Sequence, residues 1–245
     1  MNGNTGIAGG RRRRLPALLA SCVVPAALMS AGSAASARTL VASVKPSQAL
    51  VTLLSVREAR SGASSLSPAV GLIPPTTPIT GERTTLPVLA RHGRWLKVEL
   101  PGRPNGHTGW ILDTATHRSF TDWHLVVDTS LRRVTVYLAG RPVRVFQAVV
   151  GKPSTPTPAG EFYIEESIAL RAGDVGAPFA LALSARSDVL QEFDGGPGQI
   201  AVHGLRNVGG VPGTAVSHGC VRLDDSAMRW LVARVGPGVP VTITD

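Results

Sequence analysis

Residues 200–223 read IAVHGLRNVGGVPGTAVSHGCVRL. The stretch opens with a short apolar run up to His203, which predicts a strand. A glycine-rich segment then leads to Ser217, His218, Gly219 and Cys220. A thiol, two imidazoles and a flexible loop so close in sequence are the components of nucleophilic chemistry, and the rest of the chain is interpreted outward from them.

Cys220 is the candidate nucleophile of this stretch. A cysteine attacks a carbonyl as the thiolate, so it needs a base or a lowered pKa. The ring of His218 would be hard to aim at the sulfur from two residues away, whereas the loop after His203 can fold back to place that ring beside Cys220. We therefore predict His203 as the general base, with the Gly204 carbonyl as the acceptor that sets the tautomer of its ring.

The run Ser217-His218-Gly219-Cys220 also supplies consecutive backbone N–H groups. Gly219 lets the backbone approach a substrate closely. Such N–H groups can form an oxyanion hole for a tetrahedral intermediate. Nucleophile, base and oxyanion donors from one segment predict acyl transfer.

The segment resembles the active-site motif of the L,D-transpeptidase (YkuD) family, in which a His and a loop precede Ser/Thr-His-Gly-Cys. GKPSTPTPAGEF (residues 151–162) also resembles a family segment, and the resemblance covers roughly residues 123–245. It implies Cys220 as nucleophile, His203 as base, backbone donors from His218, Gly219 and Cys220, and a supporting role for Ser217. Two departures are a slightly short loop after His203 and Arg222 at a position where many members have Asn. An arginine at this position could hold a substrate carboxylate.

The resemblance implies formation of 3→3 cross-links in peptidoglycan. Cys220 would attack the diaminopimelate carbonyl of a stem tetrapeptide, release D-Ala and form a thioester, which an amine of a second stem resolves. Peptidoglycan stem peptides are the implied partners and carbapenems the implied inhibitors. An L,D-carboxypeptidase of the same fold and a catalytically inactive wall-binding protein stay open as alternatives. No cofactor is expected, because His203, His218 and Cys220 lack an evident fourth ligand for zinc.

The catalytic domain is expected over residues 122–245, as a mainly β sandwich or barrel with a few helices. The apolar run at 123–129 and the alternation at 132–139 predict strands, and a turn at 139–142 predicts a hairpin with residues 143–150. Further strands are expected at 162–165 and 200–203. A helix is predicted from a cap at Asp225 to about Val235, and its core-facing stripe consists of Met228, Leu231, Val232 and Val235.

A small β module is expected over residues 49–118. Residues 49–60 could form a helix or a strand, and residues 61–80 are predicted as loop because they are rich in Ser and Pro. Strands are predicted at 85–89, 95–100 and 109–112. RWLKVELPGRPNGHTGWI (residues 94–111) resembles the bacterial SH3-like modules of cell-wall proteins, which implies a small β-barrel with a wall-binding or positioning role.

Residues 1–37 have the organisation of a secretory signal peptide. Arg11–Arg14 precede the uncharged stretch from Leu15, and Ala35-Ser36-Ala37 form a small-residue cleavage site. Export to the extracytoplasmic cell wall is therefore expected, with residues 38–48 as a linker. An uncleaved membrane anchor and lipidation at Cys22 stay open, and this segment is the only expected membrane contact.

The composition agrees with an exported β protein. Hydrophobic residues make up 43%, aromatic residues 4%, and the chain contains 27 Gly and 19 Pro. These values exclude a wholly disordered chain and favour short strands with many turns. The net charge of +9 falls to +5 without residues 1–37. This surplus suits an anionic wall and is too diffuse to indicate a nucleic-acid partner.

Overall fold

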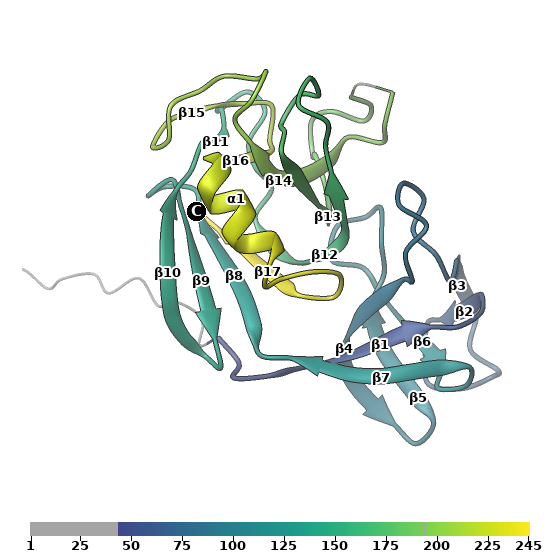
Figure 1. The fold of residues 1–245 in the computed structure, drawn as a ribbon. Helices are drawn as coiled ribbons and strands as arrows, with labels where there is room; N and C mark the ends of the chain where they lie inside the picture. Colours follow the sequence, from purple (N-terminus) through teal and green to yellow (C-terminus); the bar gives the residue numbers. More distant parts are fainter. Residues whose placement is uncertain (1–43, 194) are drawn as a thin grey trace, which may run out of the picture. The chain divides into compact units, whose positions relative to one another are not determined.

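The computed structural model describes residues 44–193 and 195–245, whose regular structure is almost entirely β (Figure 1). The prediction of a mainly β chain is confirmed. The described residues belong to a single unit of the chain. The predicted signal peptide and most of the predicted linker lie outside the described residues.

The N-terminal sheet has seven strands in the order β3-β2-β6-β5-β4-β1-β7. All neighbours in this sheet are antiparallel. Its strands are β1 (Gln48–Leu53), β2 (Arg57–Arg60), β3 (Ala69–Ile73), β4 (Thr85–His92), β5 (Trp95–Glu99), β6 (Thr108–Leu112) and β7 (Thr116–Thr121). The predicted SH3-like character of this sheet stays a prediction.

The C-terminal sheet has eight strands in the order β10-β9-β8-β17-β12-β13-β14-β16. Its strands are β8 (Trp123–Asp128), β9 (Arg133–Leu138), β10 (Arg141–Gln147), β12 (Gly160–Ala169), β13 (Phe179–Arg186), β14 (Gln199–Gly204), β16 (Val221–Leu223) and β17 (Pro240–Thr244). The C-terminal strand β17 lies between β8, to which it is parallel, and β12, to which it is antiparallel. The short strands β11 (Val150–Gly151) and β15 (Ala215–Ser217) form a separate parallel pair.

The β9–β10 hairpin shows how local sequence produces this sheet. Val134 and Val136 alternate with more polar residues in β9 and are fully buried. The two turn residues, Ala139 and Gly140, have φ values of 49° and 75°. Positive φ at both positions matches the twist of antiparallel strands, so this turn returns the chain directly into β10.

Three local expectations need correction. Residues 49–60 form β1 and β2, so the helical alternative is wrong. Residues 61–80 contain β3, which pairs only with β2 at the sheet edge and exposes all its residues except Ile73. An edge strand of this kind has no buried alternation, so its sequence does not look like a strand. Asp224 rather than Asp225 caps the helix, because its Oδ1 accepts from the Ala227 amide at 2.8 Å.

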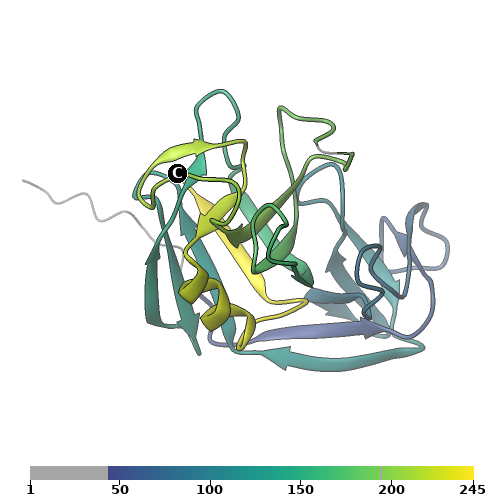
Figure 2. The same ribbon diagram turned by 45° about the horizontal axis from the view of Figure 1, so that its top comes forward.

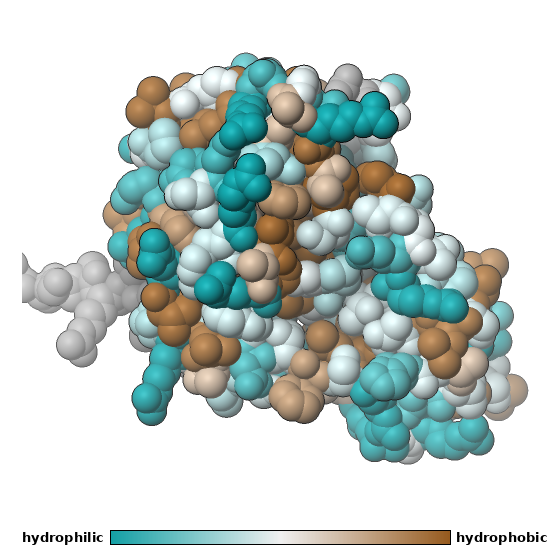
Figure 3. Space-filling view, viewed as in Figure 1, coloured by the Kyte–Doolittle hydropathy of each residue, from teal (hydrophilic) through white to brown (hydrophobic). Residues whose placement is uncertain are grey.

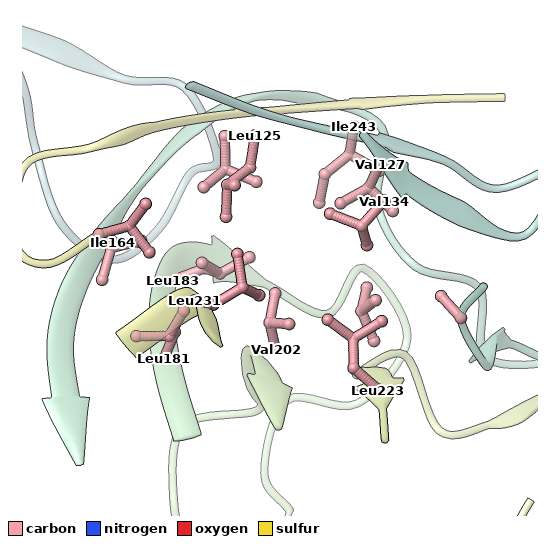
Figure 4. Close-up of a cluster of buried hydrophobic side chains, with 14 of the residues drawn as sticks. Leu125, Val127, Val134, Ile164, Leu181, Leu183, Val202, Leu223, Leu231 and Ile243 are labelled. Atoms are coloured by element: carbon pink, nitrogen blue, oxygen red, sulfur yellow. The ribbon is translucent and has the colours of Figure 1, made fainter. Parts of the chain in front are cut away.

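The helix α1 (Asp225–Val232) covers one face of the C-terminal sheet and ends before Val235. Met228 and Leu231 are buried and join a core whose strand residues point toward one another (Figure 4). The labelled members of that core are Leu125, Val127, Val134, Ile164, Leu181, Leu183, Val202, Leu223, Leu231 and Ile243. With eight residues, α1 is too short to cross a membrane, and the described part of the chain offers no other helix that could.

The N-terminal sheet has its own core, which includes one residue from the C-terminal sheet. Tyr163 of β12 is 1% exposed and packs with Val51, Leu53 and Leu86 of the N-terminal sheet. The two sheets are therefore connected through their interiors as well as by the chain.

On the surface shown in Figure 3, hydrophilic residues are spread among hydrophobic ones.

Candidate active site

The register of β14 and β16 brings His203 and Cys220 to one face of the C-terminal sheet. Val202 pairs with Val221, and His203 pairs with Arg222 in this parallel ladder. Val202 and Val221 are fully buried in the core. Because side chains alternate along a strand, His203, Arg222 and Cys220 point to the opposite face. They line a cavity of about 370 Å³ there. The turned view in Figure 2 brings this end of the sheet forward.

The ring of His203 is held in a defined tautomer. Its Nδ1 lies 2.8 Å from the Gly204 carbonyl oxygen. A carbonyl oxygen can only accept, so Nδ1 carries the proton and the lone pair is on Nε2. Burial lowers the pKa of His203 most, the Gly204 hydrogen bond raises it, and the charge of Arg222 lowers it further. The imidazole is therefore neutral at neutral pH and able to accept a proton.

Two glycines allow the backbone beside this ring to pack tightly. Gly176 has a φ of 84°, and a Cβ there would lie 2.5 Å from His203 Nδ1. Its carbonyl accepts a hydrogen bond of 2.7 Å from the Gly204 amide. A Cβ on Gly204 would lie 1.9 Å from the Ala177 carbonyl oxygen. Sequence reasoning missed Gly176, because nothing in its local sequence distinguishes it from Gly173.

The Cys220 thiol is half-buried and free. Burial raises its pKa, and a backbone hydrogen bond with Ala201 and the charge of Arg222 partly oppose this effect. The sulfur therefore carries its proton at neutral pH. A thiol in this state needs a base to become a nucleophile.

Ser217 organises the turn that precedes the thiol. Its Oγ donates to the Cys220 carbonyl at 2.6 Å and accepts from the Gly219 amide at 3.1 Å. The predicted oxyanion donor Gly219 thus already has an acceptor. The amides of His218 and Cys220 have none among the residues that the structure describes. These two amides are the donors still able to bind an oxyanion.

Residues 122–243 match the model of the YkuD family, described as the L,D-transpeptidase catalytic domain. They form a YkuD domain. A Bacillus subtilis (strain 168) protein named YkuD is 29% identical over 149 residues, which is 60% of this chain and 73% of that protein. L,D-transpeptidase 1 of Mycobacterium tuberculosis (strain H37Rv) is 25% identical over 228 residues, 74% of this chain and 84% of the relative. The solved catalytic domain of an Enterococcus faecium L,D-transpeptidase acylated by ertapenem has 23% identity and a TM-score of 0.37, covering 50% of this chain and 96% of that domain.

The segment Gly151–Pro158 of the YkuD domain supports the turn at Ser217–Cys220. Thr157 Oγ1 donates to the Gly219 carbonyl at 2.8 Å and accepts from the Gly151 amide at 2.9 Å. Thr155 Oγ1 donates to the Ser217 carbonyl at 3.2 Å. Both threonines are buried. This proline-rich segment, noted in the sequence only for its resemblance, therefore holds the carbonyls on either side of His218.

His218 lines the cavity, and its side chain contacts Phe193 and Lys152. Its ring stacks on Phe193, with ring centroids 5.6 Å apart and an interplanar angle of 29°. Its Nε2 lies 3.5 Å from the Lys152 ammonium nitrogen. The side chain of His218 thus contacts the cavity rim, while its backbone belongs to the turn.

Arg222 introduces a positive charge into the cavity of the YkuD domain. It is 8% exposed, and its Nη1 donates to the carbonyls of Val208 and Gly209 at 3.4 Å and 3.2 Å. Its Nε is buried without a partner among the described residues. Burial lowers the pKa of the guanidinium, but an arginine remains charged in proteins. Arg222 therefore holds the glycine-rich loop and adds a positive charge to the cavity lining.

The described residues contain no group of three or more His, Cys, Asp or Glu side chains that could hold a metal ion. The lining of the cavity combines the reacting pair with apolar and amide groups. Its residues are Val175, Ser187, Leu190, Phe193, Gly198, Gln199, Ile200, His203, Asn207, Val208, His218, Cys220 and Arg222.

Proposed function

We propose that this chain is a peptidoglycan L,D-transpeptidase with Cys220 as nucleophile and His203 as general base. The observation that carries the proposal is the cavity of the YkuD domain, which a protonated thiol and a neutral imidazole line together. The relatives named L,D-transpeptidase support the reaction class. Peptidoglycan as substrate and 3→3 cross-links as product are parts of this proposal.

In the first step His203 Nε2 takes the thiol proton while the sulfur of Cys220 bonds to the diaminopimelate carbonyl carbon of a stem tetrapeptide. The oxyanion accepts hydrogen bonds from the His218 and Cys220 amides. The intermediate collapses to a thioester, and the proton on His203 passes to the departing amine of D-Ala. An amine of a second stem then attacks the thioester carbon and loses its proton to His203. The C–S bond breaks, the new amide is released, and His203 returns the proton to the sulfur of Cys220.

Arg222 is proposed to bind a carboxylate of the donor stem. Arg222 lines the cavity that holds Cys220 and carries a positive charge there. A charged donor pairs with a carboxylate more strongly than a neutral one does. Carbapenems are expected to acylate the Cys220 thiol. The solved Enterococcus faecium domain is described as acylated by ertapenem.

The proposal includes export to the cell wall, where the substrate is found. The predicted signal peptide at residues 1–37 supports this location, with an uncleaved or lipidated N-terminus as variants. A wall-binding role of the N-terminal sheet belongs to the same proposal.

Mass spectrometry of the protein incubated with a diaminopimelate-containing tetrapeptide muropeptide tests the function. Loss of D-Ala with a cross-linked dimer is expected. Loss of D-Ala without a dimer would instead indicate an L,D-carboxypeptidase, in which water resolves the thioester. Absence of product and of a thioester adduct, with Cys220 inert to iodoacetamide, would favour the non-catalytic binding protein.

Two variants test the roles of the reacting pair. Cys220→Ala is expected to abolish turnover with the fold intact. His203→Ala is expected to slow acylation by roughly 10²–10⁴-fold, the usual effect of removing a general base. Tetrapeptide consumption by Cys220→Ala would contradict the mechanism.

A further inference from the structure

The loop between β5 and β6, residues 101–107, reaches from the N-terminal sheet to the active-site cavity. Arg103 Nη1 donates to the Ser187 carbonyl at 2.8 Å. Its Nη2 lies 3.1 Å from the Leu190 carbonyl oxygen and 3.4 Å from that of Pro197. Ser187 and Leu190 line the cavity that contains Cys220. One guanidinium thus joins the two parts of the chain, Ser187–Leu190 and Pro197–Gln199, that we call the pocket wall.

The two parts of the pocket wall lie close to each other and to the Arg103 guanidinium. The Ser187 amide donates to the Gly198 carbonyl at 2.8 Å, and the Leu190 amide donates to Ser187 Oγ at 3.0 Å. Gly198 has a φ of 65°, and a Cβ there would lie 2.0 Å from the Leu190 carbonyl oxygen and 3.2 Å from Arg103 Nη2. Because the two parts and the guanidinium are this close together, we expect a change at Arg103 to alter the cavity surface.

Asn105 makes a second connection from the same loop. Its Nδ2 donates to the Arg186 carbonyl at 2.7 Å, and its Oδ1 accepts from the Arg186 amide at 2.8 Å. The side chain of Arg186 forms a buried ion pair with Glu165 at 3.2 Å. Glu165 also accepts from Gln199 Nε2 at 2.7 Å. Gln199 lines the cavity four residues before His203 on β14.

We propose that Arg103 and Asn105 are positioning residues of the active site, through which the N-terminal sheet sets the affinity for the donor peptide. The inference rests on the proposed function for its substrate. Neither residue lines the cavity that holds Cys220 and His203, so the chemical step does not depend on them. Without them the wall must be ordered by the substrate, and this cost lowers the affinity.

The test compares Arg103→Ala, Asn105→Ala and the double variant with the wild type in the full chain. Arg91→Ala is the matched control, because within the described part of the chain its guanidinium donates only to the Gly93 carbonyl of its own hairpin, at 3.0 Å. KM and kcat are measured from D-Ala release with the tetrapeptide. Hydrogen exchange of the pocket wall and alkylation of Cys220 by iodoacetamide are measured on the same samples.

The double variant is expected to raise KM roughly tenfold with kcat changed less than about threefold, because wall ordering acts on binding. Exchange at the pocket wall should be faster, and iodoacetamide alkylation should be unchanged. Arg103→Lys keeps the charge but lacks the planar fork, so it should restore KM only in part. Arg91→Ala should match the wild type in all three measurements.

Unchanged exchange at the pocket wall in the double variant would overturn the proposal whether or not the wild type consumes the tetrapeptide. An equal fall in kcat and kcat/KM with KM constant would overturn it too, since the residues would then act on the chemical step. Faster exchange in the variants with a wild type that releases no D-Ala would support the wall contacts and contradict the proposed function.

Discussion

At the scale of single residues, burial determines the state of the reacting pair. The cavity raises the pKa of the Cys220 thiol and lowers the pKa of the His203 imidazole. Both effects favour the neutral forms, so the resting site holds a thiol and an imidazole rather than an ion pair. In the proposed mechanism, proton transfer to Nε2 therefore accompanies the attack on the carbonyl.

The pH dependence of acylation follows from this neutral pair. His203 acts as a base only when it is unprotonated, and a lowered folded pKa keeps it unprotonated to lower pH. The acid limb of kcat/KM is therefore expected to have its midpoint below about pH 6.5, the ordinary histidine value. D-Ala release measured across the acid range checks this. A midpoint at or above the ordinary value would contradict the neutral pair, and His203→Ala should lack the limb.

Gly176→Ala is expected to disturb the base while the fold persists. The new Cβ would meet His203 Nδ1 at 2.5 Å, and the φ of 84° is unfavourable for alanine. A displaced ring loses its bond to the Gly204 carbonyl and its position in the cavity that also holds Cys220, so acylation should slow by about 10–100-fold.

The matched control for Gly176→Ala is Gly173→Ala, since a Cβ on Gly173 meets nothing within 4 Å. Mass spectrometry measures the acylation rates of both variants, and circular dichroism checks that both are folded. Slower acylation in Gly176→Ala alone is the expected result. Equal rates in the two variants would show that the ring does not depend on Gly176.

At the scale of elements, the site depends on short segments that hold one another. The pair β11–β15 and the segment Gly151–Pro158 fix the turn before Cys220 through buried threonine hydroxyls. An apolar run, the alternation of apolar and polar residues, and a turn sequence predicted several strands, including β8, β9 and β10. Strand β13 was missed, although it pairs with both β12 and β14.

Thr157→Val tests this support with a side chain of nearly the same shape. The change leaves the Gly219 carbonyl without its donor and the Gly151 amide without its acceptor. Loss of buried hydrogen bonds of this kind costs about 1–3 kcal/mol in the free energy of unfolding. Gly219 lies in the turn at Ser217–Cys220, between the two amides that are proposed to bind the oxyanion. We therefore expect kcat to fall as well.

Urea denaturation and D-Ala release measure both effects of Thr157→Val. Ser154→Ala, at an exposed position of the same segment, serves as control and should match the wild type. A Thr157→Val protein with normal kcat would show that the turn holds its shape without this hydroxyl.

At the scale of the whole molecule, the two sheets share interior residues. Tyr163 belongs to the YkuD domain but lies in the core of the N-terminal sheet. Glu166, also on β12, is fully buried and accepts from the Thr80 amide at 2.8 Å and the Thr80 hydroxyl at 2.9 Å. With the contacts of Arg103 and Asn105, these connections favour unfolding of both sheets in one transition.

Tyr163→Ala and Tyr163→Phe separate the ring from the hydroxyl. Removing the ring leaves a cavity in the N-terminal core and should lower the free energy of unfolding by roughly 3–5 kcal/mol. Keeping the ring in Tyr163→Phe should change stability by less than about 1 kcal/mol, because the hydroxyl has no partner among the described residues.

Thermal and urea denaturation, followed by probes in each sheet, check the Tyr163 prediction. The expected result for Tyr163→Ala is a single transition at lower stability. Two separate transitions in the wild type would contradict the shared core.

The sequence by itself determined the family of this protein and much of its local structure. The order His203, glycine-rich loop, Ser217-His218-Gly219-Cys220 predicts the reacting groups, because their types and spacing belong to one continuous segment. Alternation and turn residues identified the β hairpins for the same reason: these signals act between residues close in the chain.

Only the tertiary structure decided which amides of the turn find no acceptor among the described residues, which glycine packs against the ring of His203, and how the N-terminal sheet reaches the cavity. Gly176 contacts His203 from a separate segment, Thr157 supports a turn 62 residues away, and Arg103 contacts a wall 84 residues away. Such contacts depend on the register of strands that are distant in sequence. The residues adjacent to a side chain in the sequence therefore do not predict which distant residue it contacts.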